Sequence, residues 1–317
     1  MSEVFFRELE IPEPDINLEV GSGFHGQQTG QMLMSIEKVM LSEEPDLVIV
    51  YGDTNSTLAG ALAAVKLHIP VAHVEAGLRS FNRVMPEEHN RVLTDHCSDL
   101  LFCPTKVSVE NLKNEGIISG IHLVGDVMYD SVLHNVKLAE QKSKILEKLK
   151  LEPGSYALAT VHRAENTDDS HQLRSIFEAF EQISSDGLPV IIPLHPRTRK
   201  IISEYGLSLK YVQTIEPVSY LDMLLLEKYS KMILTDSGGV QKEAFWMKVP
   251  CITLRYETEW IETVEAGWNS VVGSDSSRIK EAVRVAQPGS KLKKVYGNGK
   301  ASQKIVEIIK TINRKSR

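Results

Sequence analysis

The chain has 317 residues and a formal net charge of −6 at pH 7. A chain longer than about 250–300 residues exceeds what one hydrophobic core usually organises, so two domains are expected. The acidic balance argues against a nucleic-acid partner, and no apolar run approaches the ~18 residues of a membrane-spanning helix.

The beginning of the chain and its cysteines bear on where the protein works. The first residues, MSEVFFRELEIPEPD, are acidic and lack the apolar stretch of a signal peptide. Three cysteines, Cys97, Cys103 and Cys251, are scattered along the chain. Their spacing fits neither a zinc site nor a disulfide framework, so a reducing cytoplasm is predicted.

In the first half, short apolar runs alternate with helical patterns, which is typical of βαβ units around a parallel sheet. Strands are predicted at residues 46–51, 69–74, 100–103 and 121–124. Helices are predicted at residues 56–68 and 91–98, and after Pro104-Thr105. A long charged helix, residues 128–149, then separates the two halves of the chain.

The same alternation resumes in the second half. Strands are predicted at residues 156–161, 189–194, 210–214, 232–235, 251–254 and 270–272. Helices are predicted at residues 170–184, 220–228, 240–247, 259–266, 277–285 and 301–314. The expected fold is therefore two doubly wound α/β halves in series, in which ligands bind beyond the carboxyl ends of the strands.

The segment ILTDSGGVQKEA contains the most specific of these strand ends. Its strand ends at Ser237, Gly238 and Gly239 and opens into a helix that carries Glu243. Two glycines allow close backbone approach, and the free N–H groups of a helix start attract an anion. We expect a phosphate site here, with Glu243 accepting hydrogen bonds from a ribose; a simple capped β–α turn is the alternative.

Two neighbouring strand ends support the phosphate interpretation. His162 and Arg163 end one strand, in ATVHRAEN. His195 ends the next, in IIPLHPRTR, where it could bind a ligand or only cap a helix.

In the first half, the strand ends carry acids instead. Asp53 ends one strand and Glu75 ends the next, and Glu87 and Glu88 lie on the loop that follows Glu75. Neighbouring carboxylates shift one another's pKa and can divide acid and base roles. Taken singly, each could be a helix cap, but their convergence at adjacent strand ends favours catalysis. His73, within the strand, is expected to support them through hydrogen bonds.

The combination predicts an enzyme for a nucleotide-linked substrate, with the phosphate and acid/base groups in different domains. No P-loop pattern GxxxxGK[ST] is present. No D-x-D signature accompanies the phosphate site, so neither a metal nor a cofactor is predicted.

Several segments together resemble the UDP-N-acetylglucosamine 2-epimerase family, of the non-hydrolysing type. The resemblance covers essentially the whole chain and rests on LVIVYGDT, PVAHVEAGLRS, MPEEHNR, ATVHRAEN, ILTDSGGVQKEA and the YETEW–ETVEAG segment. It implies two Rossmann-like domains around a central cleft, the glycosyltransferase-B-like arrangement. The implied domains are residues 1–125 with 301–317, and residues 126–300. Members are usually cytoplasmic homodimers that act on a UDP-sugar for surface polysaccharide synthesis.

The resemblance also implies a mechanism and its residues. UDP is eliminated to give a 2-acetamidoglucal and is added back after the proton returns to the opposite face of C2. Asp53, Glu75 and Glu87 match the acid/base residues of the family, and His162 matches the histidine near the diphosphate. Ser237, Gly238 and Glu243 match the UDP-binding positions.

The chain departs from the family pattern at two places. Family chains begin with a strand and a Gly-Thr-Arg-Pro-Glu loop upstream of the position matched by Met1, so we expect an incomplete first sheet and weak activity. Glu259-Trp260 replaces a Glu-Arg-Pro-Glu motif and resembles the UDP-2,3-diacetamido-2,3-dideoxyglucuronate 2-epimerases. Three alternatives to epimerisation of UDP-GlcNAc therefore stay open. The chain could be a UDP-2,3-diacetamido-2,3-dideoxyglucuronate 2-epimerase, a hydrolysing 2-epimerase or an inactive UDP-sugar-binding fragment.

Overall fold

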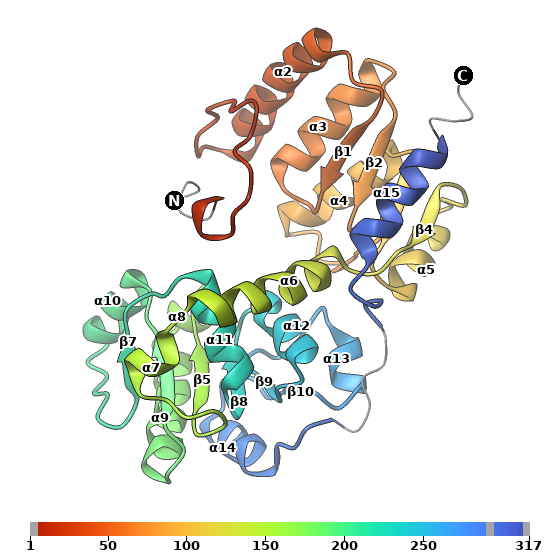
Figure 1. The fold of residues 1–317 in the computed structure, drawn as a ribbon. Helices are drawn as coiled ribbons and strands as arrows, with labels where there is room; N and C mark the ends of the chain where they lie inside the picture. Colours follow the sequence, from red (N-terminus) through yellow and green to blue (C-terminus); the bar gives the residue numbers. More distant parts are fainter. Residues whose placement is uncertain (1–5, 290–294, 313–317) are drawn as a thin grey trace. The chain divides into compact units, whose positions relative to one another are not determined.

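The computed structural model describes residues 6–289 and 295–312. These residues divide into two compact units, each built around one parallel sheet (Figure 1). The four-stranded unit contains residues 12–131 and 295–312, and the six-stranded unit contains residues 132–289 and 6–11. The chain therefore passes from the four-stranded to the six-stranded unit after residue 131, whereas the predicted boundary was residue 125, and residues 6–11 were predicted to belong to the four-stranded unit. None of the described helices is long and apolar enough to span a bilayer.

The four-stranded unit has the strand order β1-β2-β3-β4, all parallel. Its strands are β1 (Val48–Tyr51), β2 (Val71–Val74), β3 (Leu100–Cys103) and β4 (Ile121–Leu123). Its helices are α2 (His25–Glu43), α3 (Asn55–Lys66), α4 (Pro86–Cys97), α5 (Lys106–Asn114) and α15 (Ala301–Ile312). The helix α6 (Val127–Lys142) begins in this unit and ends in the other.

The core of the four-stranded unit takes in a helix from the far end of the chain. Strands β2 and β3 are buried at every position, as expected for a sheet covered on both faces. Ile305 of α15 packs in the same cluster as Val74 and Phe102. Asp130 accepts hydrogen bonds from the backbone N–H groups of Ala301 and Ser302, and so caps α15.

The six-stranded unit has the strand order β10-β9-β8-β5-β6-β7, again parallel. Its strands are β5 (Ala157–Thr160), β6 (Val190–Pro193), β7 (Gln213–Ile215), β8 (Met232–Thr235), β9 (Cys251–Thr253) and β10 (Asn269–Val271). Its further helices are α7 (Ile145–Leu149), α8 (Ala164–Thr167), α9 (Ser170–Ser185), α10 (Pro196–Glu204), α11 (Tyr220–Tyr229), α12 (Gly238–Met247), α13 (Ile261–Glu265) and α14 (Ser276–Val285).

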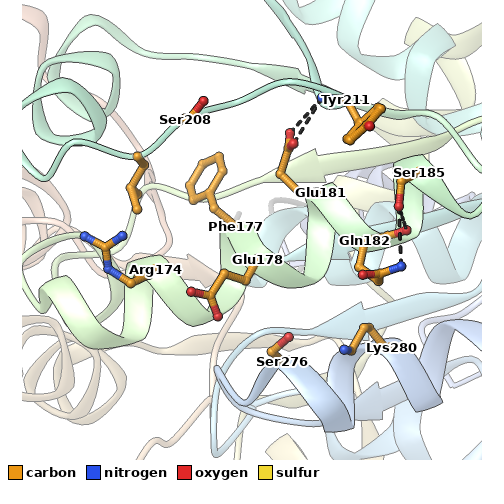
Figure 2. Close-up of a pocket in the computed structure, with 11 residues that line it drawn as sticks. Arg174, Phe177, Glu178, Glu181, Gln182, Ser185, Ser208, Tyr211, Ser276 and Lys280 are labelled. Atoms are coloured by element: carbon orange, nitrogen blue, oxygen red, sulfur yellow. Dashed lines mark hydrogen bonds between the residues drawn. The ribbon is translucent and has the colours of Figure 1, made fainter.

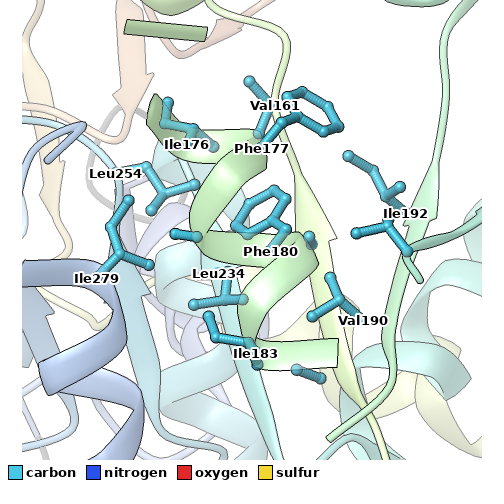
Figure 3. Close-up of a cluster of buried hydrophobic side chains, with 14 of the residues drawn as sticks. Val161, Ile176, Phe177, Phe180, Ile183, Val190, Ile192, Leu234, Leu254 and Ile279 are labelled. Carbon is cyan, nitrogen blue, oxygen red and sulfur yellow. The ribbon is translucent and has the colours of Figure 1, made fainter. Parts of the chain in front are cut away.

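Helix α9 supplies much of the core on one face of this sheet. Its N-cap is Asp169, whose carboxylate accepts the backbone N–H of His171, and its apolar residues recur every three or four positions. Figure 3 shows Phe177 and Phe180 of α9 packed among side chains from the sheet and from α14, including Val190, Ile192, Leu234 and Ile279.

The strands lie close to their predicted positions, but several helices differ. The predicted helix 128–149 is two helices, α6 and α7, because Ser143 accepts the N–H of Ile145 and donates to Asp222. Helix α4 starts at Pro86 rather than at residue 91, since proline suits the first helical turn. Helices α2, α8 and α10 were not predicted. Residues 313–314 of the last predicted helix lie outside the described residues.

Candidate active site

The ends of β1 and β2 bring two of the predicted acids together. The register pairs Tyr51 with Val74, so Gly52-Asp53 and Glu75 leave the sheet side by side. A Cβ added to Gly52 would lie 3.5 Å from Oε2 of Glu75. The carboxylate of Glu75 therefore rests against the backbone of the turn that carries Asp53.

The backbone of Glu75 is itself unusual. Its φ of +73° lies in the left-handed region, which a residue with a side chain rarely adopts. Such a conformation costs about 1–3 kcal/mol and persists only where the surroundings impose it, often at functional sites. The strained position is thus consistent with a functional carboxylate.

Helix α4 holds the Asp53 turn from the other side. The guanidinium of Arg91 reaches Oδ2 of Asp53 at 2.5 Å and Oε2 of Glu88 at 2.9 Å. The amide of Asn90 donates to the backbone oxygen of Asp53 at 2.9 Å. We did not single out Arg91 from the sequence, although it lies four residues after Glu87, on the same helix face.

Glu87 and Glu88 have different surroundings. Glu88 is buried and accepts the N–H and hydroxyl of Ser80 and the N–H of Phe81. Burial alone would raise the pKa of Glu88, but these hydrogen bonds and Arg91 keep it below its usual value. Glu88 thus braces the loop, whereas Glu87 is half-buried in the first turn of α4.

In the six-stranded unit, the predicted phosphate turn starts a helix. Ser237 is the N-cap of α12, and its hydroxyl accepts the N–H of Val240. The helix begins at Gly238, two residues before the predicted start. A Cβ at Gly238 would lie 3.2 Å from Nε1 of Trp260 and 4.0 Å from the guanidinium of Arg163. A larger residue here would need the Trp260 side chain to shift by a few tenths of an ångström, and a cation lies at the helix start.

The fully buried Asp236 joins this turn to the end of β5. Its carboxylate accepts the backbone N–H groups of His162 and Arg163, each at 3.1 Å, and the side-chain amide of Asn166 at 3.1 Å. The ring Nδ1 of His162 lies 3.3 Å from Oδ1 of Asp236. Two predicted binding residues are thus fixed next to the Ser237 turn.

A hollow of about 550 Å³ lies beyond the ends of β5, β6 and β7. Its walls contain His162, His195 and Tyr220 together with apolar side chains. His195 also caps α10 by accepting the N–H of Arg197, so the capping alternative is met while the ring still borders the hollow. Tyr220 donates to Glu243 at 2.9 Å. Burial raises the pKa of Glu243.

The segment after β9 adds charged and aromatic groups near Gly238. Glu259 forms a two-point ion pair with Arg255, at 2.9 and 3.0 Å. Burial would raise the pKa of Glu259, but Arg255 outweighs it and lowers the pKa. The ammonium group of Lys242 lies 4.2 Å from the centre of the Trp260 ring, a cation–π distance.

A second hollow, of about 510 Å³, lies between α9, α14 and residues 207–211 (Figure 2). None of the predicted site residues lines it. Its Glu181 already accepts backbone N–H groups of Lys210, Tyr211 and Val212. It lies away from the strand ends that carry the candidate residues and is not the candidate site.

The segment GSGFHG, Gly21–Gly26, matches the spacing of a dinucleotide fingerprint, GxGxxG. That motif acts only between a strand and a helix. Here the preceding residues 11–24 form no strand, and the glycines lead directly into α2. The match therefore gives no support for a dinucleotide.

Two parallel-sheet units with polar groups gathered beyond their strand ends define an α/β enzyme of the doubly wound, glycosyltransferase-B-like class, as predicted. A family model described as UDP-N-acetylglucosamine 2-epimerase matches residues 1–310. The chain belongs to this family, as its motifs indicated, and is an enzyme of the epimerase type.

Individual relatives agree with this assignment. The chain is 56% identical to a UDP-N-acetylglucosamine 2-epimerase homolog from Methanococcus maripaludis, covering 98% of this chain and 88% of the relative. It is 52% identical to the UDP-2,3-diacetamido-2,3-dideoxy-D-glucuronate 2-epimerase of Pseudomonas aeruginosa, covering 98% and 87%. The solved structure of Methanocaldococcus jannaschii UDP-GlcNAc 2-epimerase in complex with UDP-GlcNAc and UDP is similar at a TM-score of 0.85, with 50% identity over 98% of this chain and 88% of that chain.

Proposed function

We propose that the protein epimerises a UDP-N-acetylhexosamine at C2 and converts UDP-GlcNAc into UDP-ManNAc. The observation that carries this proposal is the pairing of Asp53 and Glu75 at adjacent strand ends, with Glu75 in a strained backbone conformation. Two carboxylates beside each other suit a reaction that removes a proton and later returns one.

The reaction proceeds by elimination and re-addition. A carboxylate takes the C2 proton, the electron pair of that C–H bond forms the C1=C2 double bond, and UDP leaves with the C1–O electrons. The intermediate is a 2-acetamidoglucal. A proton then returns to the opposite face of C2 while a UDP oxygen re-forms the bond to C1. Asp53, Glu75 and Glu87 supply the acid and base, and the assignment of each step to one of them stays open.

The six-stranded unit binds the UDP part. Its free N–H groups at the start of α12, together with Ser237, Arg163 and His162, stabilise the charge of the diphosphate as it leaves. Gly238 and Gly239 leave room for the phosphate oxygens. Glu243 accepts hydrogen bonds from the ribose. The hollow beside His195 has an apolar lining that suits a flat base, from Val161, Pro193, Pro217, Val218 and Met223.

A second candidate substrate is UDP-2,3-diacetamido-2,3-dideoxyglucuronate. Its uronate carboxylate adds a negative charge that UDP-GlcNAc lacks. The ammonium group of Lys242, stacked on Trp260 beside Gly238, favours such a charge. The ratio of kcat/KM values for the two sugars decides between them. Release of free sugar with UDP instead identifies the hydrolysing alternative.

The experiment that tests the proposal is incubation with UDP-GlcNAc in D₂O, followed by proton NMR. We expect deuterium at C2 and the appearance of the manno epimer. A Glu110→Gln variant, which changes an exposed ion pair with Lys113 on α5, is the matched control and should behave like the natural protein. Absence of exchange with either UDP-sugar, alongside measurable UDP binding, would identify a UDP-binding protein that does not catalyse epimerisation.

A homodimer and a cytoplasmic location remain predictions of the proposal. Light scattering after size-exclusion chromatography measures the first directly. A mass equal to one chain at micromolar concentration contradicts it.

A further inference from the structure

Asp95 is a buried carboxylate that contacts the loops of the acid/base cluster without belonging to it. It lies on α4 and is 1% exposed. His73 Nδ1 lies 2.7 Å from its Oδ1, and Arg79 donates to its Oδ2 at 2.7 Å. The backbone N–H of Gly77 donates to both oxygens, at 3.1 and 3.3 Å. One side chain thus ties together β2, the loop after it and α4.

The residues that Asp95 binds lie on both sides of Glu75 along the chain. His73 lies two residues before Glu75 and Gly77 two residues after it, and both bind Asp95. Gly77 has a φ of +78°, and a Cβ there would lie 2.3 Å from the backbone oxygen of Ser108. The loop is therefore confined on one side by α5 and anchored on the other by Asp95. This double restraint accounts for the left-handed conformation of Glu75.

His73 extends the same network to Asp53. Its Nε2 lies 2.7 Å from the backbone oxygen of Gly52, the residue before Asp53. A carbonyl oxygen can only accept, so Nε2 carries a hydrogen and donates it. Because Asp95 faces the other ring nitrogen, the fully buried ring fixes the distance between α4 and the Gly52 turn.

The negative charges of Asp95 and Glu115 are balanced by the guanidinium group of Arg79, which lies between them. Arg79 binds Asp95 with one nitrogen and forms a two-point pair with Glu115 through two others, at 2.6 and 2.7 Å. A buried ion pair with such complete hydrogen bonding is weak evidence for stability but can specify one conformation. What it specifies here is the path of the backbone on both sides of Glu75.

We propose that Asp95 is the positioning residue of this site, and that through His73 and Gly77 it sets the placement of Asp53 and Glu75. Glu87 depends on it as well, because Glu87 and Asp95 lie on the same helix. The inference rests on the proposed function for its effect on rate. Its structural part, control of the two loops, does not depend on which sugar reacts.

The first test compares Asp95→Asn with Glu115→Gln. Each removes one carboxylate charge from the partners of Arg79, but only Asp95 also binds His73 and Gly77, which flank Glu75. Misplacement of a reacting group by 1 Å can cost about 10²-fold in rate. We expect Asp95→Asn to lose kcat on that scale, with KM for the UDP-sugar and Kd for UDP unchanged. Glu115→Gln should keep its kcat.

The second test uses hydrogen–deuterium exchange of the backbone, which requires no activity. In Asp95→Asn, peptides covering residues 52–54 and 75–79 should exchange faster than in Glu115→Gln. If Asp95→Asn does not fold, two variants of His73 test the two ends of the network separately: the contact with the Gly52 turn and the contact with Asp95. His73→Asn keeps an amide near the Nδ1 position and should loosen only the Gly52 turn. His73→Gln keeps one near the Nε2 position and should loosen the loop around Gly77.

The outcomes separate the two proposals. A natural protein that shows no C2 exchange with any UDP-sugar refutes the proposed function, and the exchange of the two loops then decides the role of Asp95. Equal protection of those loops in Asp95→Asn and Glu115→Gln overturns the positioning role. So does an equal loss of kcat in both variants, which would assign the effect to the charge balance of Arg79.

Discussion

The two units treat their buried acids and bases differently. In the four-stranded unit, two arginines near the cluster are paired with acids: Arg79 with Asp95 and Glu115, and Arg91 with Asp53 and Glu88. In the six-stranded unit, the buried Asp236 is held mainly by neutral backbone and amide donors.

The difference has a functional consequence. Because backbone N–H groups hold Asp236, the guanidinium of Arg163 is left near the start of α12, where an anion would bind. In the four-stranded unit, Arg79 and Arg91 compensate carboxylates of the cluster and its surroundings, which fits proton transfer rather than anion binding. We therefore expect substitutions in the two units to affect different steps; two predictions test this division, and a third concerns a buried acid that has no cation.

The largest effect is expected for Glu75→Gln. Loss of a general acid or base lowers rates by about 10²–10⁴-fold. The rate of C2 deuterium exchange should fall by this factor, while the Kd for UDP, measured by calorimetry, stays unchanged. Weakened UDP binding in this variant would contradict a division of work between the units.

A smaller effect, on UDP binding rather than on the rate of proton exchange, is expected for Gly238→Ala. The new methyl group would approach Nε1 of Trp260 at 3.2 Å and crowd the helix start. The Kd for UDP should rise about tenfold, equivalent to 1.4 kcal/mol. Gly30→Ala in α2 is the matched control, since nothing lies within 4 Å of a Cβ at that position and Gly30 belongs to no predicted site. Equal affinities of the two variants would show that the close approach is unimportant.

The smallest expected effect is on the pH dependence of stability, and it concerns Glu227, a buried acid that has no ion-pair partner among the described residues. Glu227 of α11 is fully buried, and within the described part of the chain neither of its carboxyl oxygens has a hydrogen-bond partner. Burial, and then the charge of Glu243, raise the pKa of Glu227 well above its usual value. The folded protein thus keeps a proton that the unfolded chain loses near pH ~4.3.

The sign of the pH effect follows from this. Stability from Glu227 is fully present below the unfolded pKa and is lost as pH rises towards the raised folded pKa, at up to about 1.4 kcal/mol per pH unit. Glu227→Gln cannot lose a proton. Its melting temperature should therefore fall less than that of the natural protein between pH 4 and 8, as checked by calorimetry. Parallel curves would mean that Glu227 is not protonated in the folded state.

Much of the fold could be predicted because most of its strands are short, mainly apolar runs; β7 (Gln213–Ile215) and β10 (Asn269–Val271) are the polar exceptions. Their ends locate the candidate residues, since parallel strands end at one edge of a sheet. Helix α2 was missed because its residues are largely exposed and only Met40 is buried, so it has no clear apolar stripe. The break between α6 and α7 depends on a contact between Ser143 and Asp222, which are far apart in the sequence.

The parts of the site that could not be predicted are long-range contacts. Asp95 looks like an ordinary polar residue in the middle of a helix, and its importance comes from three partners on other elements. His73 was expected to support the acids, and the structure gives it two specific partners. The functional roles of Asp53, Glu75, Glu87 and the UDP-binding residues remain predictions until the experiments above are done.

The position of α15 has a consequence for how the chain is made. The ribosome completes β1 to β4 first, yet Ile305, which fills part of their core, is synthesised only after the whole six-stranded unit. The early sheet must therefore wait with an apolar face uncovered while most of the later unit is synthesised and folds. Its exposure to chaperones and to aggregation is set by the time needed to translate the residues in between.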